Sequence, residues 1–384
     1  MGNQHHQRMN KIAYSFFRLS LAVLITSVAQ AQPSTSAPSG KGPYHVSQTF
    51  HVGGEGGWDY LTADPEHKLL FVPRSTHTMV IDARTGRVAA DIPGQKRNHG
   101  VALVAGAGRG FITDGADGSV TVFDLNTYAV LGKVKAAEDA DEIIYDPASG
   151  KVLVVCGDAG VLISISPDLD LATGKADAAV ELGGKPEFLA ADGQGKAYIN
   201  LVDKDQVAVV DTKTMKVVNR WPTTPGGSPV GMAMDVTKRR LFIGCRKPQK
   251  LVVTGADDGK VLADLAIGAG VDATKFDGEA FASCSDGTLT VVRETAPGRF
   301  QIIQTVQTPR GARTMGIDPT SPSPTITGVS ATDERAIIQR AAGLVGNLGT
   351  LGGDFAKDGS PSHPGPSWLC ALENTHGPIA RQGS

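Results

Sequence analysis

The sequence has little net charge and few aromatic residues, and it lacks the common cysteine motifs. Lys and Arg number 37 against 39 Asp and Glu, so the formal charge of −2 gives no electrostatic reason to expect a nucleic-acid partner. The four cysteines form neither a CxxC pair nor the CxxCH motif that attaches haem. Cys156, Cys245 and Cys284 end short apolar runs, and we predict that they are buried small side chains.

Catalytic motifs are missing as well. The chain contains no Gly-x-Ser-x-Gly elbow, no HExxH pair and no phosphate-binding loop. The sequence therefore carries no independent signature of a serine hydrolase, a zinc protease or a nucleotide-binding enzyme. We expect neither haem nor a nucleotide as a cofactor.

The N-terminus has the pattern of a secretory signal peptide. Lys11 and Arg18 supply the positive region, Leu19–Val28 is apolar, and a small-x-small motif ends at Ala31. We predict a signal peptide over residues 1–31, a linker over residues 32–43 and a periplasmic or secreted mature protein. The apolar stretch is short for a bilayer span, so the alternative of a retained anchor is the less favoured one.

What the sequence does contain is glycine, with 47 residues, and short apolar runs separated by polar turns. One unit consists of Ala197–Leu201, Gln206–Asp211 and Lys216–Trp221, and other parts of the chain repeat this trio. A further run that ends in Asp, such as Phe188–Asp192, precedes each trio. Branched and aromatic side chains fill the runs, as they do in pleated strands. Four strands per unit, with a period of about 42 residues, predict the blades of a β-propeller.

One position of the repeat is ionisable in almost every unit. It lies five residues before the terminal Asp of the leading run, or at the equivalent place, and recurs at intervals of 40 to 46 residues. Seven such positions predict an all-β, seven-bladed propeller. The innermost strand of each blade lines the central channel, so we predict that these side chains form a collar at one channel mouth. The collar residues are Asp59, His99, Asp141, Glu187, Val230, Asp272 and Arg313, of which only Val230 is apolar.

The two ends of the propeller require a closing strand. His45–Val52 precedes the first unit, and we predict that it pairs with the last blade, which begins at Ala312. The propeller then spans residues 44–318. After Pro319 the strand pattern stops, so residues 319–384 are predicted to be an atypical, poorly ordered tail and blade seven to be incomplete. The tail is either a frameshifted reading of blade seven or a natural extension.

The repeats resemble a known family. Ala197-Tyr-Ile-Asn with Gln206-Val-Ala-Val-Val-Asp, and Gly110-Phe-Ile-Thr with Ser119-Val-Thr-Val-Phe-Asp, are similar to the YVTN repeat. The resemblance covers roughly Tyr44–Asp318 and implies a member of the YVTN-repeat (YncE-like) bacterial propellers. Such proteins are exported and seven-bladed, most have no assigned reaction, and some have binding roles.

Three interpretations of the collar are open. It can bind a small ligand, a divalent cation or a protein partner, since carboxylates with one imidazole suit such cations. It can hold a metal-activated water for a lactonase-like or esterase-like hydrolase, with Asp or Glu as general base. It can also be structural and solvate a water-filled channel, with Arg313 paired to a carboxylate. The candidate metal ligands are Asp59, His99, Asp141, Glu187 and Asp272.

Among these interpretations we favour a monomeric binding protein over an enzyme, with the metal-dependent hydrolase as the alternative. The ligand itself stays open, and we expect no nucleic-acid partner and no transmembrane span in the mature chain.

Overall fold

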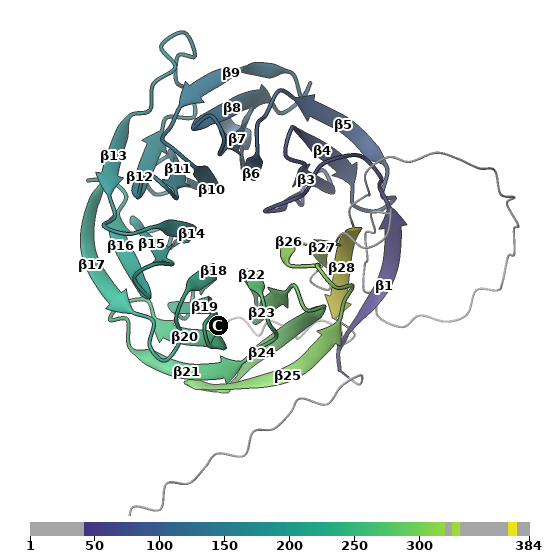
Figure 1. Cartoon of the computed structure of the whole chain (residues 1–384), viewed down its shortest axis with the longest axis vertical. Helices are drawn as coiled ribbons and strands as arrows, with labels where there is room; N and C mark the ends of the chain where they lie inside the picture. Colours follow the sequence, from purple (N-terminus) through teal and green to yellow (C-terminus); the bar gives the residue numbers. More distant parts are fainter. Residues whose placement is uncertain (1–41, 319–324, 331–367, 375–384) are drawn as a thin grey trace, which may run out of the picture. The chain divides into compact units, whose positions relative to one another are not determined.

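The computed structural model describes residues 42–318, 325–330 and 368–374, and most of these residues lie in β-strands and the turns between them (Figure 1). The predicted signal peptide and most of the predicted linker and tail lie outside the described residues. Within the described part of the chain, no helix has the length and apolar character of a membrane span.

Six antiparallel sheets follow one plan of four strands each. The first strand of each sheet is nearest the centre in Figure 1, and the second strand pairs with it. The first strands are β2 (Thr62–Asp64), β6 (Asn98–Val104), β10 (Ala140–Asp146), β14 (Pro186–Ala191), β18 (Pro229–Asp235) and β22 (Val271–Asp277). The second strands are β3 (Leu69–Pro73), β7 (Arg109–Asp114), β11 (Lys151–Cys156), β15 (Lys196–Leu201), β19 (Arg240–Arg246) and β23 (Glu279–Cys284).

The third and fourth strands complete each sheet toward its outer edge (Figure 1). The third strands are β4 (His77–Asp82), β8 (Ser119–Asp124), β12 (Val161–Ile165), β16 (Gln206–Asp211), β20 (Gln249–Gly255) and β24 (Thr288–Ala296). The fourth strands are β5 (Val88–Pro93), β9 (Val130–Lys135), β13 (Ala178–Glu181), β17 (Lys216–Pro222), β21 (Val261–Ala266) and β25 (Arg299–Gln307). A single 3₁₀ turn, η1 (Ala105–Ala107), joins β6 to β7.

Four further strands pair in the order β1 (Tyr44–His51), β28 (Trp368–Asn374), β27 (Thr325–Ser330) and β26 (Thr314–Asp318). The sequence pattern predicts the first and last of these strands and gives no signal for β27 or β28. Both of the unsignalled strands lie in the tail beyond Pro319, where each is held by ladder partners on both sides.

The first strands contact one another in a closed order. β2 contacts β6, and the contacts continue through β10, β14, β18 and β22 to β26, which returns to β2. The sheets are therefore arranged around a common centre in the manner of a β-propeller (Figure 1).

Packing between neighbouring sheets explains the apolar runs of the sequence. The second and third strands are buried along nearly their whole length, whereas the fourth strands are mostly exposed. Phe111 and Val122 from one sheet share a core cluster with Val154 and Ile163 from the next. A strand covered on both faces must be apolar on both faces, so its sequence reads as a continuous run rather than an alternation.

The predicted turn chemistry is present at the links between third and fourth strands. The Asp124 carboxylate accepts hydrogen bonds from the backbone N–H groups of Asn126 and Thr127, at 3.0 and 2.8 Å. Asp211 accepts the same pair of bonds from the two equivalent positions of its own turn. These carboxylates fold the turn locally before any tertiary contact is needed.

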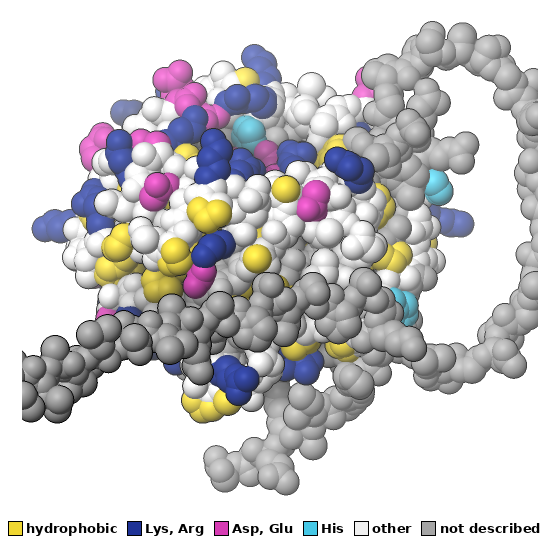
Figure 2. All heavy atoms as spheres, turned by 60° about the horizontal axis from the view of Figure 1, so that its bottom comes forward, with side chains coloured by type: hydrophobic (Ala, Val, Ile, Leu, Met, Phe, Trp, Pro, Cys, Tyr) yellow, Lys and Arg dark blue, Asp and Glu magenta, His cyan; other side chains and the backbone are white. Residues whose placement is uncertain are grey.

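Surface composition is mixed on the visible side of the molecule. Lys and Arg side chains lie among Asp and Glu in Figure 2, and apolar side chains are scattered between them. As predicted, Cys156, Cys245 and Cys284 are buried free thiols, and burial raises the pKa of each to about 12.

A buried side-chain amide connects the first strand of the chain to the outer strand of the sixth sheet. Gln304 Oε1 accepts a hydrogen bond from the Tyr44 N–H at 2.9 Å, and Gln304 Nε2 donates to the Tyr44 carbonyl at 2.6 Å. Both hydrogen bonds are buried and join residues 260 positions apart in the sequence.

We predict that Gln304→Ala lowers the free energy of unfolding by roughly 2 kcal/mol, because two buried backbone groups of Tyr44 lose their partner. Urea unfolding followed by tryptophan fluorescence measures the change. Gln301→Ala is the matched control, because Gln301 is exposed on the same strand. An equal effect of both substitutions would contradict the proposed attachment of β1.

Candidate functional site

All six ionisable collar residues lie around one cavity of about 300 Å³. His99, Asp141, Glu187 and Asp272 stand near the starts of the first strands β6, β10, β14 and β22, while Asp59 and Arg313 precede β2 and β26. Val230 is fully buried in β18 and does not line the cavity. We call this cavity the mouth. Its lining residues are Asp59, Tyr60, Arg97, His99, Asp139, Asp141, Lys185, Glu187, Arg246, Asp272 and Arg313.

A repeated irregularity of the backbone turns the collar side chains toward the mouth. Five first strands shift register against their second strands at the collar position, as a β-bulge does. The shifts fall between Asn98 and Val101, Ala140 and Ile143, Pro186 and Leu189, Pro229 and Met232, and Val271 and Ala273. A bulge frees the residue from the regular alternation of the strand, so its side chain can point along the central axis instead of into the packed core.

One half of the mouth is a cluster of two carboxylates and an imidazole. His99 Nδ1 lies 2.6 Å from Asp59 Oδ2 and 3.5 Å from Asp141 Oδ1. One ligand atom of each residue lies within 4.8 Å of the others, which is the spacing that ligands of one metal ion require. Among the residues described, this is the cluster with metal-ligand spacing. Glu187 and Asp272, the other two predicted ligands, line the same cavity without joining it.

Asp141 and His99 each keep one buried polar atom without a hydrogen bond. Asp141 is 8% exposed, and its Oδ1 atom, 3.5 Å from His99 Nδ1, has no hydrogen-bond partner among the described residues; the same is true of His99 Nε2. Burial, together with the nearby carboxylates of Asp59 and Glu187, raises the pKa of Asp141 well above its ordinary value. A buried, unpaired acceptor oxygen needs a proton or a cation beside it.

The other half of the mouth centres on Asp272, which two guanidinium groups share. Arg313 Nε donates to Asp272 Oδ2 at 2.5 Å, and Arg246 Nη2 binds the other carboxylate oxygen. Arg313 also stacks over the Trp58 ring, 5.5 Å from its centroid, and its Nη2 lies 4.0 Å from Asp59 Oδ1. Arg313 therefore connects the two halves of the mouth.

Two buried aromatic rings meet beneath the mouth. The rings of Tyr60 and Phe188 meet edge to face at 5.2 Å, and both residues are buried. Tyr60 precedes β2 and Phe188 lies in β14, and these two strands stand three or four steps apart around the circle of first strands. Their contact therefore reaches across the circle of first strands. Tyr60 also lines the mouth, so this aromatic pair forms part of its floor.

A buried arginine fixes the loop that delivers Asp59. Arg74 is fully buried, and its guanidinium donates to the carbonyl groups of Gly53, Gly54 and Gly56 at 2.9 to 3.3 Å. Burial lowers the pKa of Arg74 to about 10, which keeps the group charged at neutral pH. The collar residues within first strands are held by the backbone hydrogen bonds of their β-sheet. For the loop before Asp59, the Arg74 side chain supplies hydrogen bonds in place of a neighbouring strand.

The same β3–β4 hairpin also holds the residue before His99. The backbone N–H of Asn98 donates to the Ser75 carbonyl at 3.1 Å, and Asn98 Nδ2 donates to the His77 carbonyl at 2.8 Å. The hairpin therefore positions both Asp59 and His99 and sets the distance between them.

Several residues of the mouth carry no signal in the repeat pattern. Tyr60 reads as an ordinary core residue, and Arg97, Asp139 and Lys185 fall in turns. Arg246 ends β19, so it enters the mouth from a second strand rather than a first one.

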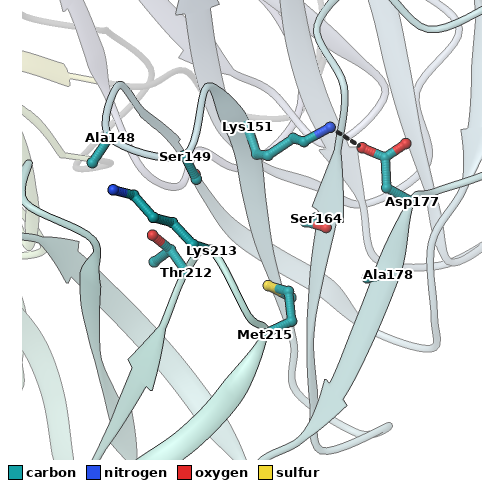
Figure 3. Close-up of a pocket in the computed structure, with 9 residues that line it drawn as sticks. All are labelled: Ala148, Ser149, Lys151, Ser164, Asp177, Ala178, Thr212, Lys213 and Met215. Carbon is teal, nitrogen blue, oxygen red and sulfur yellow. Dashed lines mark hydrogen bonds and ion pairs between the residues drawn. The ribbon is translucent and has the colours of Figure 1, made fainter.

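Another cavity, of about 420 Å³, lies between the third and fourth sheets (Figure 3). Lys151 Nζ lies 2.8 Å from Asp177 within the third sheet, and Thr212 Oγ1 donates to the Asp146 carboxylate at 2.7 Å, which joins the fourth sheet to the third. No side-chain oxygen that lines this cavity is buried without a hydrogen-bond partner, in contrast to Asp141 Oδ1.

No protein-family model matches the chain, and no curated protein matches its sequence. The function of the mouth is therefore inferred from its own geometry.

We predict that Arg74→Met accelerates amide hydrogen exchange in residues 53–59 by about tenfold and lowers the free energy of unfolding by roughly 3 kcal/mol, because three carbonyl groups lose a charged donor. Exchange mass spectrometry measures the first effect. Arg84→Met is the control, because the Arg84 side chain is 62% exposed. Unchanged exchange in Arg74→Met would show that other contacts hold the loop.

Glu142, beside Asp141 in β10, generates a prediction about pH. Burial raises the pKa of Glu142 from 4.5 to about 7. The folded chain therefore keeps a proton between these pH values that the unfolded chain releases, so stability falls as pH rises through this window, by roughly 3 kcal/mol in total.

We predict that Glu142→Gln removes this fall: the variant is more stable than the wild type at pH 8 and loses that advantage at pH 4. Urea unfolding across this pH range measures both curves. The exposed Glu181→Gln is the control. Parallel curves for wild type and Glu142→Gln would refute the assignment.

Proposed function

We propose that this protein binds a divalent cation, together with a small ligand, in the mouth at the centre of the first strands. The main support for this proposal is the cluster of Asp59, His99 and Asp141, whose ligand atoms lie within 4.8 Å of one another. The cluster includes a buried carboxylate oxygen, Asp141 Oδ1, that accepts no hydrogen bond. A cation there would satisfy that oxygen and relieve the repulsion between the two carboxylates.

The size of the mouth supports a small ligand rather than a protein partner. A concave cavity of about 300 Å³ is at the lower end of small-molecule sites. Tyr60 adds an aromatic ring to a lining that is otherwise ionisable, as small-molecule sites combine apolar and polar groups.

We further propose that the architecture is an exported, seven-bladed propeller of the YVTN-repeat type. Support for the seventh blade comes from the pairing of β1 with β28 and of β26 with β27, and from the contacts of β26 with both β22 and β2. The ion pair between Lys68 and Asp318, at 3.1 Å, joins residues on either side of this closure. The N-terminal signal pattern supports export to the periplasm or the medium.

We predict that the purified protein binds one Mn²⁺ ion per chain, and that Asp141→Asn weakens this binding by roughly 100-fold because it removes a charged ligand. Isothermal titration calorimetry measures the affinity. Burial and the neighbouring carboxylates raise the pKa of the metal-free Asp141 carboxyl, so protons compete with Mn²⁺ for this ligand and the affinity falls as the pH is lowered.

Asp264→Asn is the matched control for this titration, because Asp264 is a carboxylate of a fourth strand that pairs with Lys250 outside the mouth. If the wild type binds no Mn²⁺, the mouth is a structural charge network. Turnover of a lactone or ester that requires Mn²⁺ and is lost in Asp141→Asn would assign the hydrolase instead of the binding protein.

A further inference from the structure

The charges of the mouth are arranged in two layers. The carboxylate side chains of Asp59, Asp139, Asp141 and Asp272 are only 7–20% exposed. The cationic side chains of Arg97, Lys185, Arg246 and Arg313 are 35–56% exposed. A molecule that approaches the mouth therefore meets cations first and carboxylates only below them.

Two of the five carboxylates of the mouth are already paired closely with these cations. Asp139 pairs with Arg97 and lies 3.9 Å from Lys185, while Asp272 is shared by Arg246 and Arg313. A divalent ion on the Asp59–His99–Asp141 cluster would balance two more negative charges. The lining side chains comprise four cations and five carboxylates, so a divalent ion would change their formal charge balance from −1 to +1. Lys185 is also paired with Asp158, which lies outside the lining.

The two guanidinium groups on Asp272 keep donors in reserve. Arg246 uses Nε for the Val271 carbonyl and Nη2 for Asp272. Arg313 uses Nε for Asp272 and Nη2 for the Trp58 carbonyl. Among the described residues, no hydrogen bond engages Nη1 of either group. Each guanidinium is thus held in place through Nε and Nη2, while its Nη1 donors have no partner among the described residues. A planar guanidinium with such donors is suited to bind an oxyanion.

The Arg313 guanidinium stands beside the cation cluster. Its Nη2, which donates to the Trp58 carbonyl, is 4.0 Å from Asp59 Oδ1, an oxygen of a cluster residue. An oxyanion has two or three oxygens on one atom, so it can place one oxygen on the ion and another on a guanidinium across such a distance. One small oxyanion could therefore bind the metal ion through one oxygen and accept a hydrogen bond from the guanidinium through another.

We propose that the ligand of the mouth is a small molecule with an oxyanion group, a carboxylate or a phosphate, held jointly by the bound divalent ion and by Arg246 and Arg313. This inference rests on the proposed cation binding. It implies positive coupling: the ion increases the affinity for the oxyanion, and the oxyanion increases the affinity for the ion by the same factor.

Inorganic phosphate is the probe, and Mn²⁺ is the ion. With Mn²⁺-loaded protein at fixed ionic strength, the ³¹P relaxation rate of phosphate should rise above that with free Mn²⁺ at the same concentration. At Mn²⁺ concentrations that saturate each protein, Arg246→Gln should weaken phosphate binding by about tenfold, the cost of one charge-assisted hydrogen bond. Arg240→Gln, at the other end of β19, should leave phosphate binding unchanged.

The outcomes separate this inference from the proposed function. Mn²⁺ binding without any protein-dependent phosphate signal, or a phosphate affinity that is the same in Arg246→Gln, would overturn the oxyanion assignment and leave cation binding intact. Failure to bind Mn²⁺ would remove both. Competition by succinate distinguishes the two forms of the ligand: stronger displacement than by added phosphate identifies a carboxylate, and weaker displacement identifies a phosphate.

Discussion

The packing of each sheet against both of its neighbours is the constraint on which the structure depends. It makes the second and third strands apolar on both faces and leaves them no room for charge. The ionisable groups of the mouth lie in turns and near the ends of strands. The register shifts of four first strands let their collar side chains, such as Asp272, face the centre, whereas Val230 stays buried. Asp59 and Arg313 reach the same place from the segments before β2 and β26.

Bringing these carboxylates together has an energetic cost, because like charges are buried close to one another in the mouth. Burial beside like charges raises the pKa values of Asp141, Glu187 and Asp272, which means that their ionised forms are disfavoured in the folded protein. Two arginines offset the cost at Asp272, but no hydrogen bond of the described residues satisfies Asp141 Oδ1. A residue that is destabilising for the fold and central to a cavity has the character of a functional residue.

Sequence periodicity could predict that the collar residues share a mouth, because equal spacing in a repeat places Asp59, His99 and Asp141 at equal heights around one axis. It could not predict the floor, since Tyr60 and Phe188 look like ordinary core residues until opposite strands are brought together. Nor could it assign Arg246, which reaches the mouth from the end of a second strand, outside the repeated position. The pairing of β27 and β28 depends on partner strands rather than on local pattern.

The arrangement of the mouth bears on the interpretations of the charged collar. The β3–β4 hairpin holds the loop before Asp59 through Arg74 and the residue before His99 through Asn98, so the fold positions both side chains. Groups positioned in this way need little further ordering when an occupant binds, because the entropy cost of fixing them is met during folding. The same contacts stabilise the loop itself, so they fit a structural collar as well as the binding site that we propose.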